Sequence, residues 1–365
     1  MAIRLIFSIT IFLFCTGNLS AFERLWYVKD EKWGLESFQK FHGKIDIVAP
    51  QTYFLKQNGV VVGSVPTVIL NTKEKINKNL KIMPLLANIT HYKDASGKQK
   101  EYFNRNPVHN LLDNPKNWEK VSKFMREEAY KYGYLGWQLD LENIEVNRRE
   151  KLNEFVKYLK SEFDKDGLKL SIAVVSKISD EEKDYKVYEK RHPGYWKYWA
   201  GVFDYKTLGE NTDFVSVMIY DQPNSPGPVA TIDWSKQVIE YAKTQISQEK
   251  ISFGIPSYGW AYRSSELATG KSMFSMVDFD FTNSKINNYN KKDTRNMTTG
   301  AGNSKIFGDI SWVSYNSSGK NYTIWYEDVN SFKKKYEQIK SLAPNAHGFS
   351  VWVLGDEDKN IWNLF

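Results

Sequence analysis

The segment from Tyr134 to Glu142 carries polar side chains at alternate positions near its end. Because side chains alternate across a β-strand, Gln138, Asp140 and Glu142 share one face. Two carboxyl groups one pleat apart resist ionising together, which raises the pKa of one and keeps it protonated near neutral pH. A protonated carboxyl can donate a proton, so the spacing favours general acid chemistry over an ordinary polar strand end or a surface ion pair.

The apolar residues of the same segment indicate where this strand lies. Trp137, Leu139 and Leu141 occupy the opposite face, which would pack against helices. In a barrel of parallel strands, inward polar side chains are tolerated mainly near the carboxyl ends, where active sites lie. The segment therefore predicts the fourth strand of such a barrel, with Glu142 at its reachable end.

Apolar, β-rich runs alternate along the chain with stretches of helical periodicity, which is typical of βα units around a parallel sheet. Eight runs are predicted to be strands: Leu25–Val28, Ile45–Pro50, Lys81–Ala87, Gly136–Leu141, Leu170–Val175, Phe214–Tyr220, Ile251–Pro256 and His347–Val353. Amphipathic segments predict helices at Trp118–Tyr132, Arg149–Asp164, Trp234–Thr244 and Val329–Leu342, the last capped by Asp328. The sequence thus predicts an α/β fold, a TIM (β/α)8 barrel.

Residues 261–321 break this rhythm. They are rich in Asn, Ser, Thr and Lys and carry short β-like pieces such as Trp312–Tyr315. We expect a small insertion there, after the seventh strand. The predicted organisation is a signal peptide at 1–21 followed by one catalytic barrel domain at 22–365 that contains the insertion.

The first residues have the pattern of an export signal. Arg4 precedes the apolar run Leu5–Cys15, and small residues follow it up to Ala21. The run is shorter than the roughly 20 residues needed to span a bilayer. Leu13 and Phe14 before Cys15 do not suit a lipoprotein cleavage site. We therefore expect a secreted, extracellular or periplasmic protein without a lasting membrane span.

Composition narrows the class of partner. The formal charge is +7, but the basic residues are scattered among 43 acidic ones, so nucleic acid is not implied. Cys15 is the one cysteine, so stability after residue 21 rests on a hydrophobic core rather than disulfides. The 12 Trp and 22 Tyr residues suit stacking on sugar rings.

Several motifs on different strands occur in an order that is similar to one enzyme family. They are Asp140-Leu141-Glu142, Ser216-Val217-Met218-Ile219-Tyr220-Asp221, Gly254-Ile255-Pro256-Ser257-Tyr258-Gly259, Gly348-Phe349-Ser350-Val351-Trp352, Gly227-Pro228-Val229-Ala230 and Leu354-Gly355-Asp356-Glu357-Asp358. The chain resembles glycoside hydrolase family 18, the chitinase group, and especially its bacterial branch associated with spore cortex and peptidoglycan. Leu135 and Gln138 stand where the fuller family pattern has aspartates. Gln138 can hydrogen-bond Asp140 but cannot share a proton with it, so we expect altered pH dependence or slower turnover.

The resemblance implies a substrate-assisted retaining mechanism, in which the 2-acetamido group of the sugar attacks its own anomeric carbon. Glu142 would then be the acid and base, Asp140 would hold the acetamido N–H, and Tyr220 would fix the acetamido carbonyl. The further substrate-binding residues would be Trp352, Gln138, Met218, Asp221 and Asn88. The last two could equally serve loop hydrogen bonds.

No metal or cofactor is predicted, because the five His residues lack metal-ligand spacing and no Gly-rich phosphate loop follows a strand. The expected partner is a glycan containing N-acetylglucosamine, bound by a monomer. Chitin, peptidoglycan and N-linked glycans stay open as substrates, as does a non-enzymatic lectin-like barrel. Candidate groove aromatics are Trp196, Trp199, Trp260 and Trp312.

Overall fold

The computed structural model describes residues 22–189, 192–223, 227–263, 274–280, 282, 297–301, 310–317 and 319–365. The predicted signal peptide lies outside the described residues. No helix in the described part of the chain is long and apolar enough to cross a membrane.

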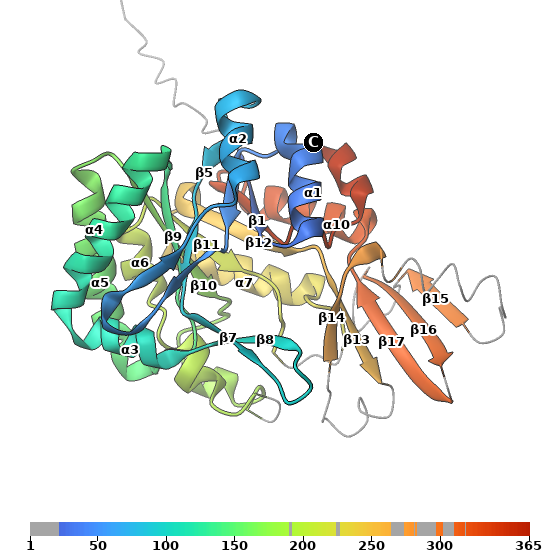
Figure 1. The fold of residues 1–365 in the computed structure, drawn as a ribbon. Coiled ribbons are helices and arrows are strands. Elements are labelled where there is room, and N and C mark those ends of the chain that lie inside the picture. Colours follow the sequence, from blue (N-terminus) through green and yellow to red (C-terminus); the bar gives the residue numbers. More distant parts are fainter. Residues whose placement is uncertain are drawn as a thin grey trace, which may run out of the picture.

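Eight parallel strand positions form a barrel, confirming the predicted α/β fold (Figure 1). The strands are β1 (Glu23–Val28), β2 (Ile47–Pro50), β5 (Lys81–Ile82) with β6 (Leu85–Ala87), β9 (Gly136–Asp140), β10 (Lys169–Val175), β11 (Phe214–Met218), β12 (Ile251–Pro256) and β18 (Gly348–Trp352). Each overlaps a predicted run, and β12 has the predicted bounds. Parallel pairing of β1 with β18 joins the first strand of the barrel to the last.

The third strand position is split, where one continuous strand was predicted. β5 pairs with β2, and β6 pairs with β9, so the two halves bond opposite neighbours. The break falls at Met83 and Pro84, because proline has no N–H to continue a ladder. The Met83 N–H still donates to Val48 O (3.0 Å), and Pro84 O accepts from the Gln138 N–H (3.0 Å). These bonds close the barrel across the split.

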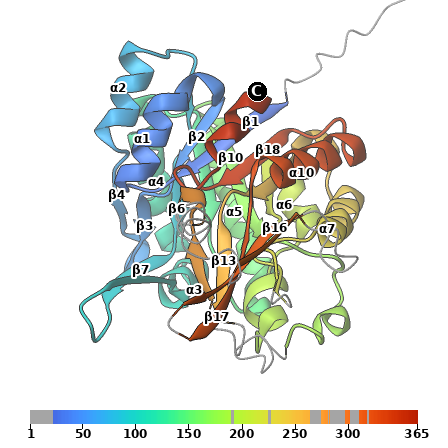
Figure 2. The same cartoon turned by 90° about the vertical axis from the view of Figure 1, so that its right-hand side faces the viewer.

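Helices cover the outside of the barrel, as both views show (Figures 1 and 2). They are α1 (Lys32–Phe41), α2 (Thr67–Lys75), α3 (Arg105–Asp113), α4 (Pro115–Tyr132), α5 (Arg149–Asp164), α6 (Tyr205–Glu210), α7 (Ile232–Gln245) and α10 (Val329–Leu342). α5 and α10 have the predicted bounds. The Asp328 side chain accepts from the N–H groups of Asn330 and Ser331, which confirms the predicted cap of α10.

Two antiparallel units lie at the carboxyl end of the barrel strands, the lower end in both views. One is a hairpin of β7 (Ile89–Lys93) and β8 (Gln99–Phe103), and β3 (Tyr53–Leu55) and β4 (Val61–Gly63) pair beside it. The other is a five-stranded sheet of β13 (Gly259–Arg263), β14 (Phe274–Val277), β15 (Met297–Ala301), β16 (Ser311–Ser317) and β17 (Lys320–Tyr326). Its strands reach Gly259 and Tyr326, beyond the compositional limits of 261 and 321.

The two faces of β9 have the predicted partners. Trp137, Leu139 and Leu141 belong to the core between strands and helices, and each is fully buried. Gln138 and Asp140 point into the barrel, where Gln138 contacts side chains of β10 and β11. The barrel interior is therefore polar at the level of β9, and this polar layer leads up to Glu142.

Candidate active site

Asp140 and Glu142 form a carboxyl pair at the carboxyl end of β9. Their side chains share a hydrogen bond, and Asp140 is 3% exposed. The amide of Gln51, directly after β2, donates to Asp140 Oδ2 (3.0 Å). Burial raises the pKa of Asp140 to about 6, against the lowering effect of these hydrogen bonds.

Glu142 is the more strongly perturbed member of the pair. Its pKa is raised well above the ordinary value, first by burial and then by the charges of Asp140 and Asp221. All three causes favour the neutral form, so Glu142 keeps its proton at a pH where an ordinary glutamate has lost it. Such a group can act as a general acid near neutral pH.

Asn88 fixes the backbone of Glu142 instead of facing the cavity. Its Oδ1 accepts from the Glu142 N–H (2.9 Å), and its Nδ2 donates to Glu142 O (2.8 Å) and Asn104 O (2.9 Å). The side chain is fully buried. These are the hydrogen bonds of the loop alternative, and a direct contact of Asn88 with sugar stays a prediction.

Gln138 also lies below the cavity. Its amide nitrogen donates to Ser171 Oγ (2.8 Å) and Ser216 Oγ (2.9 Å), and its side chain is fully buried. The amide that donates to Asp140 is that of Gln51 and not that of Gln138. In this position Gln138 holds β9 to β10 and β11, and its contact with substrate stays a prediction.

Met218, Tyr220 and Asp221 come together at the end of β11, next to Glu142. Asp221 has a left-handed backbone (φ 56°), and its carboxylate accepts a hydrogen bond from the Tyr258 hydroxyl. Burial raises the pKa of Asp221 to about 6. The Tyr220 ring packs against Gly254, where a Cβ would lie only 2.9 Å from Tyr220 Cε1.

Trp352 forms a wall of the cavity from the end of β18, with its ring 5.4 Å from that of Tyr27. Ser257, after β12, accepts from the Val353 N–H (2.8 Å) and donates to Val353 O (2.9 Å) through its hydroxyl. The Ser257 N–H donates to Trp352 O (2.8 Å). The seventh and eighth strands are thereby joined directly beneath the cavity wall.

Two cavities meet at Glu142, Met218, Tyr220 and Asp221. The first, about 130 Å³, is completed by Tyr27, Gln51, Leu85, Ile89, Glu101, Phe103, Asp140, Ala173 and Trp352. The second, about 250 Å³, is completed by Val175, His192, Tyr195, Trp199, Pro223 and Trp260. Both carboxyls of the pair line the first cavity, whereas aromatic rings dominate the second. A molecule that spans both must pass Glu142.

Sequence similarity identifies the family of this site. The sequence model of glycosyl hydrolases family 18 matches residues 43–358, most of the chain. The chain belongs to glycosyl hydrolases family 18. It is a glycosidase by that membership, and the predicted family resemblance is confirmed.

Two similar proteins come from Bacillus subtilis. The chain is 23% identical to the uncharacterized glycosylase YvbX of Bacillus subtilis (strain 168) over 366 residues, 99% of this chain and 96% of the relative. It is 27% identical to the cortical fragment-lytic enzyme of the same organism over 248 residues, 65% of this chain. The chain spans about half the length of that relative, 50% of which is matched.

Solved structures share the fold. The spore cortex-lytic enzyme SleL of Bacillus cereus matches with a TM-score of 0.76 and 21% identity, over 94% of this chain and 73% of that one. A chitinase of Chromobacterium violaceum matches with a TM-score of 0.75 and 20% identity, over 94% and 97% of the two chains. At these identities the likeness supports the barrel itself.

Several cavity residues of this family 18 protein escaped the sequence prediction. Gln51 directly follows a predicted strand, so its position at a carboxyl end was a usable signal. Glu101 lies on the β7–β8 hairpin and Tyr195 on a long loop, and neither segment has a periodic pattern of apolar residues. Among the predicted groove aromatics, Trp199 and Trp260 line the second cavity.

The other two predicted aromatics lie elsewhere. Trp196 is buried among Tyr185, Tyr188 and Tyr195, and Trp312 packs with the aromatic cluster between the small sheet and the barrel. In the part of the chain that the structure describes, no three His, Cys, Asp or Glu side chains converge as metal ligands would.

Proposed function

We propose that this glycosidase is exported and cleaves β-glycosidic bonds of N-acetylglucosamine-containing glycans by substrate-assisted retention. Glu142 is its acid and base. The observation that carries the proposal is the carboxyl pair at the junction of the two cavities, with the pKa of Glu142 raised by burial and then by the charges of Asp140 and Asp221. The protein acts as a monomer without metal or cofactor in this proposal.

The geometry of the pair favours substrate assistance over an enzyme nucleophile. A two-carboxylate retaining mechanism needs a second carboxyl on the opposite side of the anomeric carbon, about 5 Å from the acid. Asp140 is instead hydrogen-bonded to Glu142 and to Gln51, so it lies on the same side as the acid. The sugar's own acetamido oxygen then supplies the nucleophile.

The reaction proceeds in two steps with Glu142 acting in both. Glu142 gives its proton to the glycosidic oxygen as that bond breaks, while the acetamido oxygen bonds the anomeric carbon and forms an oxazolinium ion. Asp140 accepts from the acetamido N–H and stabilises the positive charge. Water then attacks the anomeric carbon, Glu142 takes its proton, and the acetamido group is restored.

Other residues position the sugar. The Tyr220 hydroxyl donates a hydrogen bond to the acetamido carbonyl, and Trp352 supports the distorted sugar ring in the first cavity. Met218 and Asp221 lie at the junction of the cavities. The aromatic second cavity takes the leaving-group sugar, because Trp199 and Trp260 offer flat apolar surfaces.

Peptidoglycan of the cortex type is the preferred substrate among the three that sequence left open. It is supported by the activity for which two similar proteins are named, a cortical fragment-lytic enzyme and the spore cortex-lytic enzyme SleL. A lectin-like function is disfavoured because the acid and its partners Asp140 and Gln51 are all in place.

The test is release of fluorophore from N-acetylglucosamine β-glycosides by the wild type and by Glu142→Gln. The substitution removes the transferable proton, so kcat should fall by about 10² to 10⁴. Glu145→Gln is the matched control, because Glu145 pairs with Arg148 (2.9 Å) on the surface side of the same segment.

Product analysis on cortex peptidoglycan, chitin and an N-linked glycan then assigns the substrate. Wild-type activity that survives Glu142→Gln would exclude Glu142 as the acid. Binding of N-acetylglucosamine oligomers without turnover would establish the lectin-like function.

A further inference from the structure

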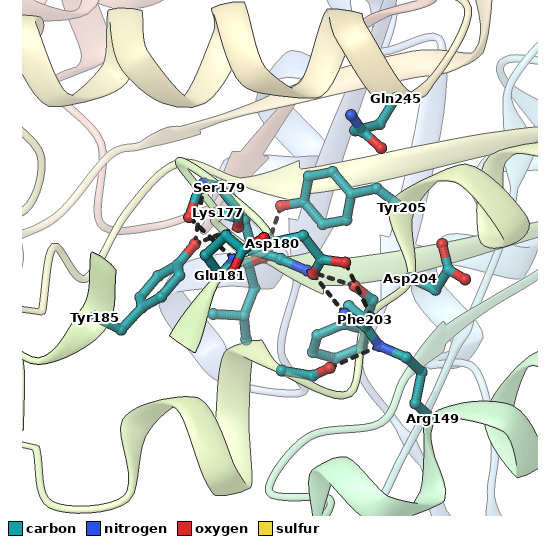
Figure 3. A network of polar contacts seen from close by, with 12 residues as sticks. Arg149, Lys177, Ser179, Asp180, Glu181, Tyr185, Phe203, Asp204, Tyr205 and Gln245 are labelled. Carbon is teal, nitrogen blue, oxygen red and sulfur yellow. Dashed lines mark hydrogen bonds and ion pairs between the residues drawn. The ribbon is translucent and has the colours of Figure 1, made fainter. Parts of the chain in front are cut away.

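Lys177 is a buried cation just beyond the end of β10, outside the carboxyl pair. Its side chain is 0% exposed. The ammonium is ion-paired with Asp180 and donates to Phe203 O (2.9 Å), so it joins both ends of the segment between β10 and α6 (Figure 3). A buried lysine lowers the stability of a fold unless its charge is compensated by an anion and by hydrogen bonds. Both are present at Lys177.

Aromatic rings complete the surroundings of the ammonium. It lies 5.2 Å from the ring centre of Trp196 and 5.4 Å from that of Tyr205, within the range of cation–π attraction. The Tyr205 hydroxyl donates to Val175 O (2.7 Å). Lys177 therefore contacts the middle of the segment, at Trp196, as well as its two ends.

Arg149 of α5 extends this network. Its guanidinium forms two hydrogen bonds with Asp180 and donates through Nε to Gly201 O (2.8 Å). Asp180 thus lies between two cations (Figure 3). The titratable and charged groups that act on Lys177 are Asp180 on the loop, Arg149 on α5 and Asp204 before α6.

The segment held by this network forms a wall of the second cavity. Tyr195 and Trp199 line that cavity with Glu142, and Trp196 between them faces Lys177. The backbone fits closely at Gly201, where a Cβ would lie 2.7 Å from Trp196 O. A shift of Trp196 would therefore move Tyr195 and Trp199 relative to the acid.

We propose that Lys177 is a positioning residue that sets the leaving-group side of the site by anchoring residues 192–203 from beneath. The inference rests on the proposed function and deepens it. Lys177 does not contact substrate; it acts through Trp196 on the two rings that do.

Anchoring by Lys177 depends on pH, because the ammonium must be charged to hold Asp180 and the two rings. Burial lowers the pKa of Lys177 from its ordinary value of 10.5 to about 8, although Asp180 opposes the shift. A lysine whose folded pKa lies below its unfolded pKa adds to the stability of the fold as pH rises between the two values. Above pH 8 Lys177 loses its proton and no longer anchors the segment, so sugar binding should become weaker there. This group would cause no loss of stability over the same pH range.

The experiment compares Lys177→Met with Lys186→Met, an exposed lysine of the same loop. With a soluble N-acetylglucosamine oligomer that spans both cavities, Lys177→Met should raise KM about tenfold and change kcat little. The wild-type KM should rise through pH 8, whereas the Lys177→Met value should stay flat. An unchanged KM and an unchanged pH profile would overturn the proposal.

Chemical rescue distinguishes the effect of the Lys177 charge from that of the side chain's shape. Residues 22–365 contain no cysteine, so Lys177→Cys can be alkylated with bromoethylamine while unfolded and then refolded, beside wild type treated in the same way. The thialysine restores an ammonium of lower pKa, so KM should recover at pH 7 and rise at a lower pH than in the wild type. Recovery by the uncharged propyl analogue would overturn the proposal.

Hydrogen exchange distinguishes failure of this inference from failure of the proposed function. Amides of residues 192–203 should exchange faster in Lys177→Met than in Lys186→Met, whether or not any glycan is cleaved. An inactive wild type would refute the proposed function alone. Unchanged exchange in this segment would refute the role of Lys177.

Discussion

Glu142 shares its surroundings with two other acids, and each has a different partner. Asp140 accepts from Gln51, and Asp221 accepts from the Tyr258 hydroxyl. Burial raises the pKa of both to about 6, so both are ionised at neutral pH. Their charges add to the effect of burial on Glu142 and leave it the proton donor of the three.

Replacing Asp221 by Asn should shift the pH profile of activity to lower pH. Removal of the negative charge lowers the pKa of Glu142, which then loses its proton at a lower pH. The alkaline limb of kcat/KM should move down by about one pH unit. Fluorophore release measured from pH 4 to pH 10 gives this limb directly.

Tyr258→Phe is the matched control for Asp221→Asn. It removes the hydrogen bond to Asp221 and keeps the carboxyl group. Its alkaline limb should stay near that of the wild type. An equal shift in both variants would show that the hydrogen bond, and not the charge, governs Glu142.

At this scale the sequence predicted which side chains face inward but not what they bind. Alternation along β9 is a local property, so the shared face of Gln138, Asp140 and Glu142 followed from spacing. The partners of Gln138 are Ser171 and Ser216 on two other strands, and that of Asp140 is Gln51. Such contacts depend on the stagger of the barrel, which a single sequence does not state.

Among the elements, β11 and β12 depend on a small residue where they meet. A Cβ at Gly254 would lie 2.8 Å from Val217 O and 2.9 Å from Tyr220 Cε1. The ring of Tyr220 therefore rests against bare backbone of the neighbouring strand. In the proposed mechanism, this contact would set the distance of the Tyr220 hydroxyl from the sugar.

Gly254→Ala should displace Tyr220 and lower kcat/KM by about 10 to 100-fold, because a misplacement near 1 Å is costly in catalysis. Gly43→Ala is the control, since nothing lies within 4 Å of a Cβ there. Steady-state kinetics of the two variants beside their melting temperatures test this. Full activity of Gly254→Ala would mean that Tyr220 need not be held so closely.

Elements with strong periodicity were predicted best. α5, α10 and β12 have the expected bounds, because their apolar residues repeat with one clear period. The β7–β8 hairpin was missed, since β8 is largely exposed and polar, as in Gln99, Lys100 and Glu101. Its position over the first cavity depends on pairs such as Lys29 with Glu101 (2.6 Å), far apart in sequence.

On the scale of the whole molecule, an aromatic stack holds the end of the described chain against its start. Trp362, in the 3-10 helix Lys359–Leu364, stacks on Trp26 of β1 (4.2 Å) and on Phe41 of α1 (4.6 Å). Its indole N–H donates to Glu357 (3.1 Å). The acidic motif Leu354–Asp358 thus stabilises the fold, since Glu357 also accepts hydrogen bonds from the Ser37 hydroxyl and the Gly355 N–H.

Trp362→Ala should lower the free energy of unfolding by about 3 to 5 kcal/mol, the usual effect of emptying a large aromatic site in a core. Trp33→Ala is the control, because Trp33 is 54% exposed and should change stability by under about 0.5 kcal/mol. Urea unfolding followed by circular dichroism measures both. Equal midpoints would show that the stack contributes nothing to stability.

The site is complete only after β1 has paired with β18. A chain synthesised only as far as α10 already has the acid pair on β9, but it lacks the strand that carries Trp352 and seals the barrel. Trp352 is then missing from the wall of the first cavity, and β1 has no neighbour on that side. We therefore expect no hydrolysis until β18 has paired with β1 and β12.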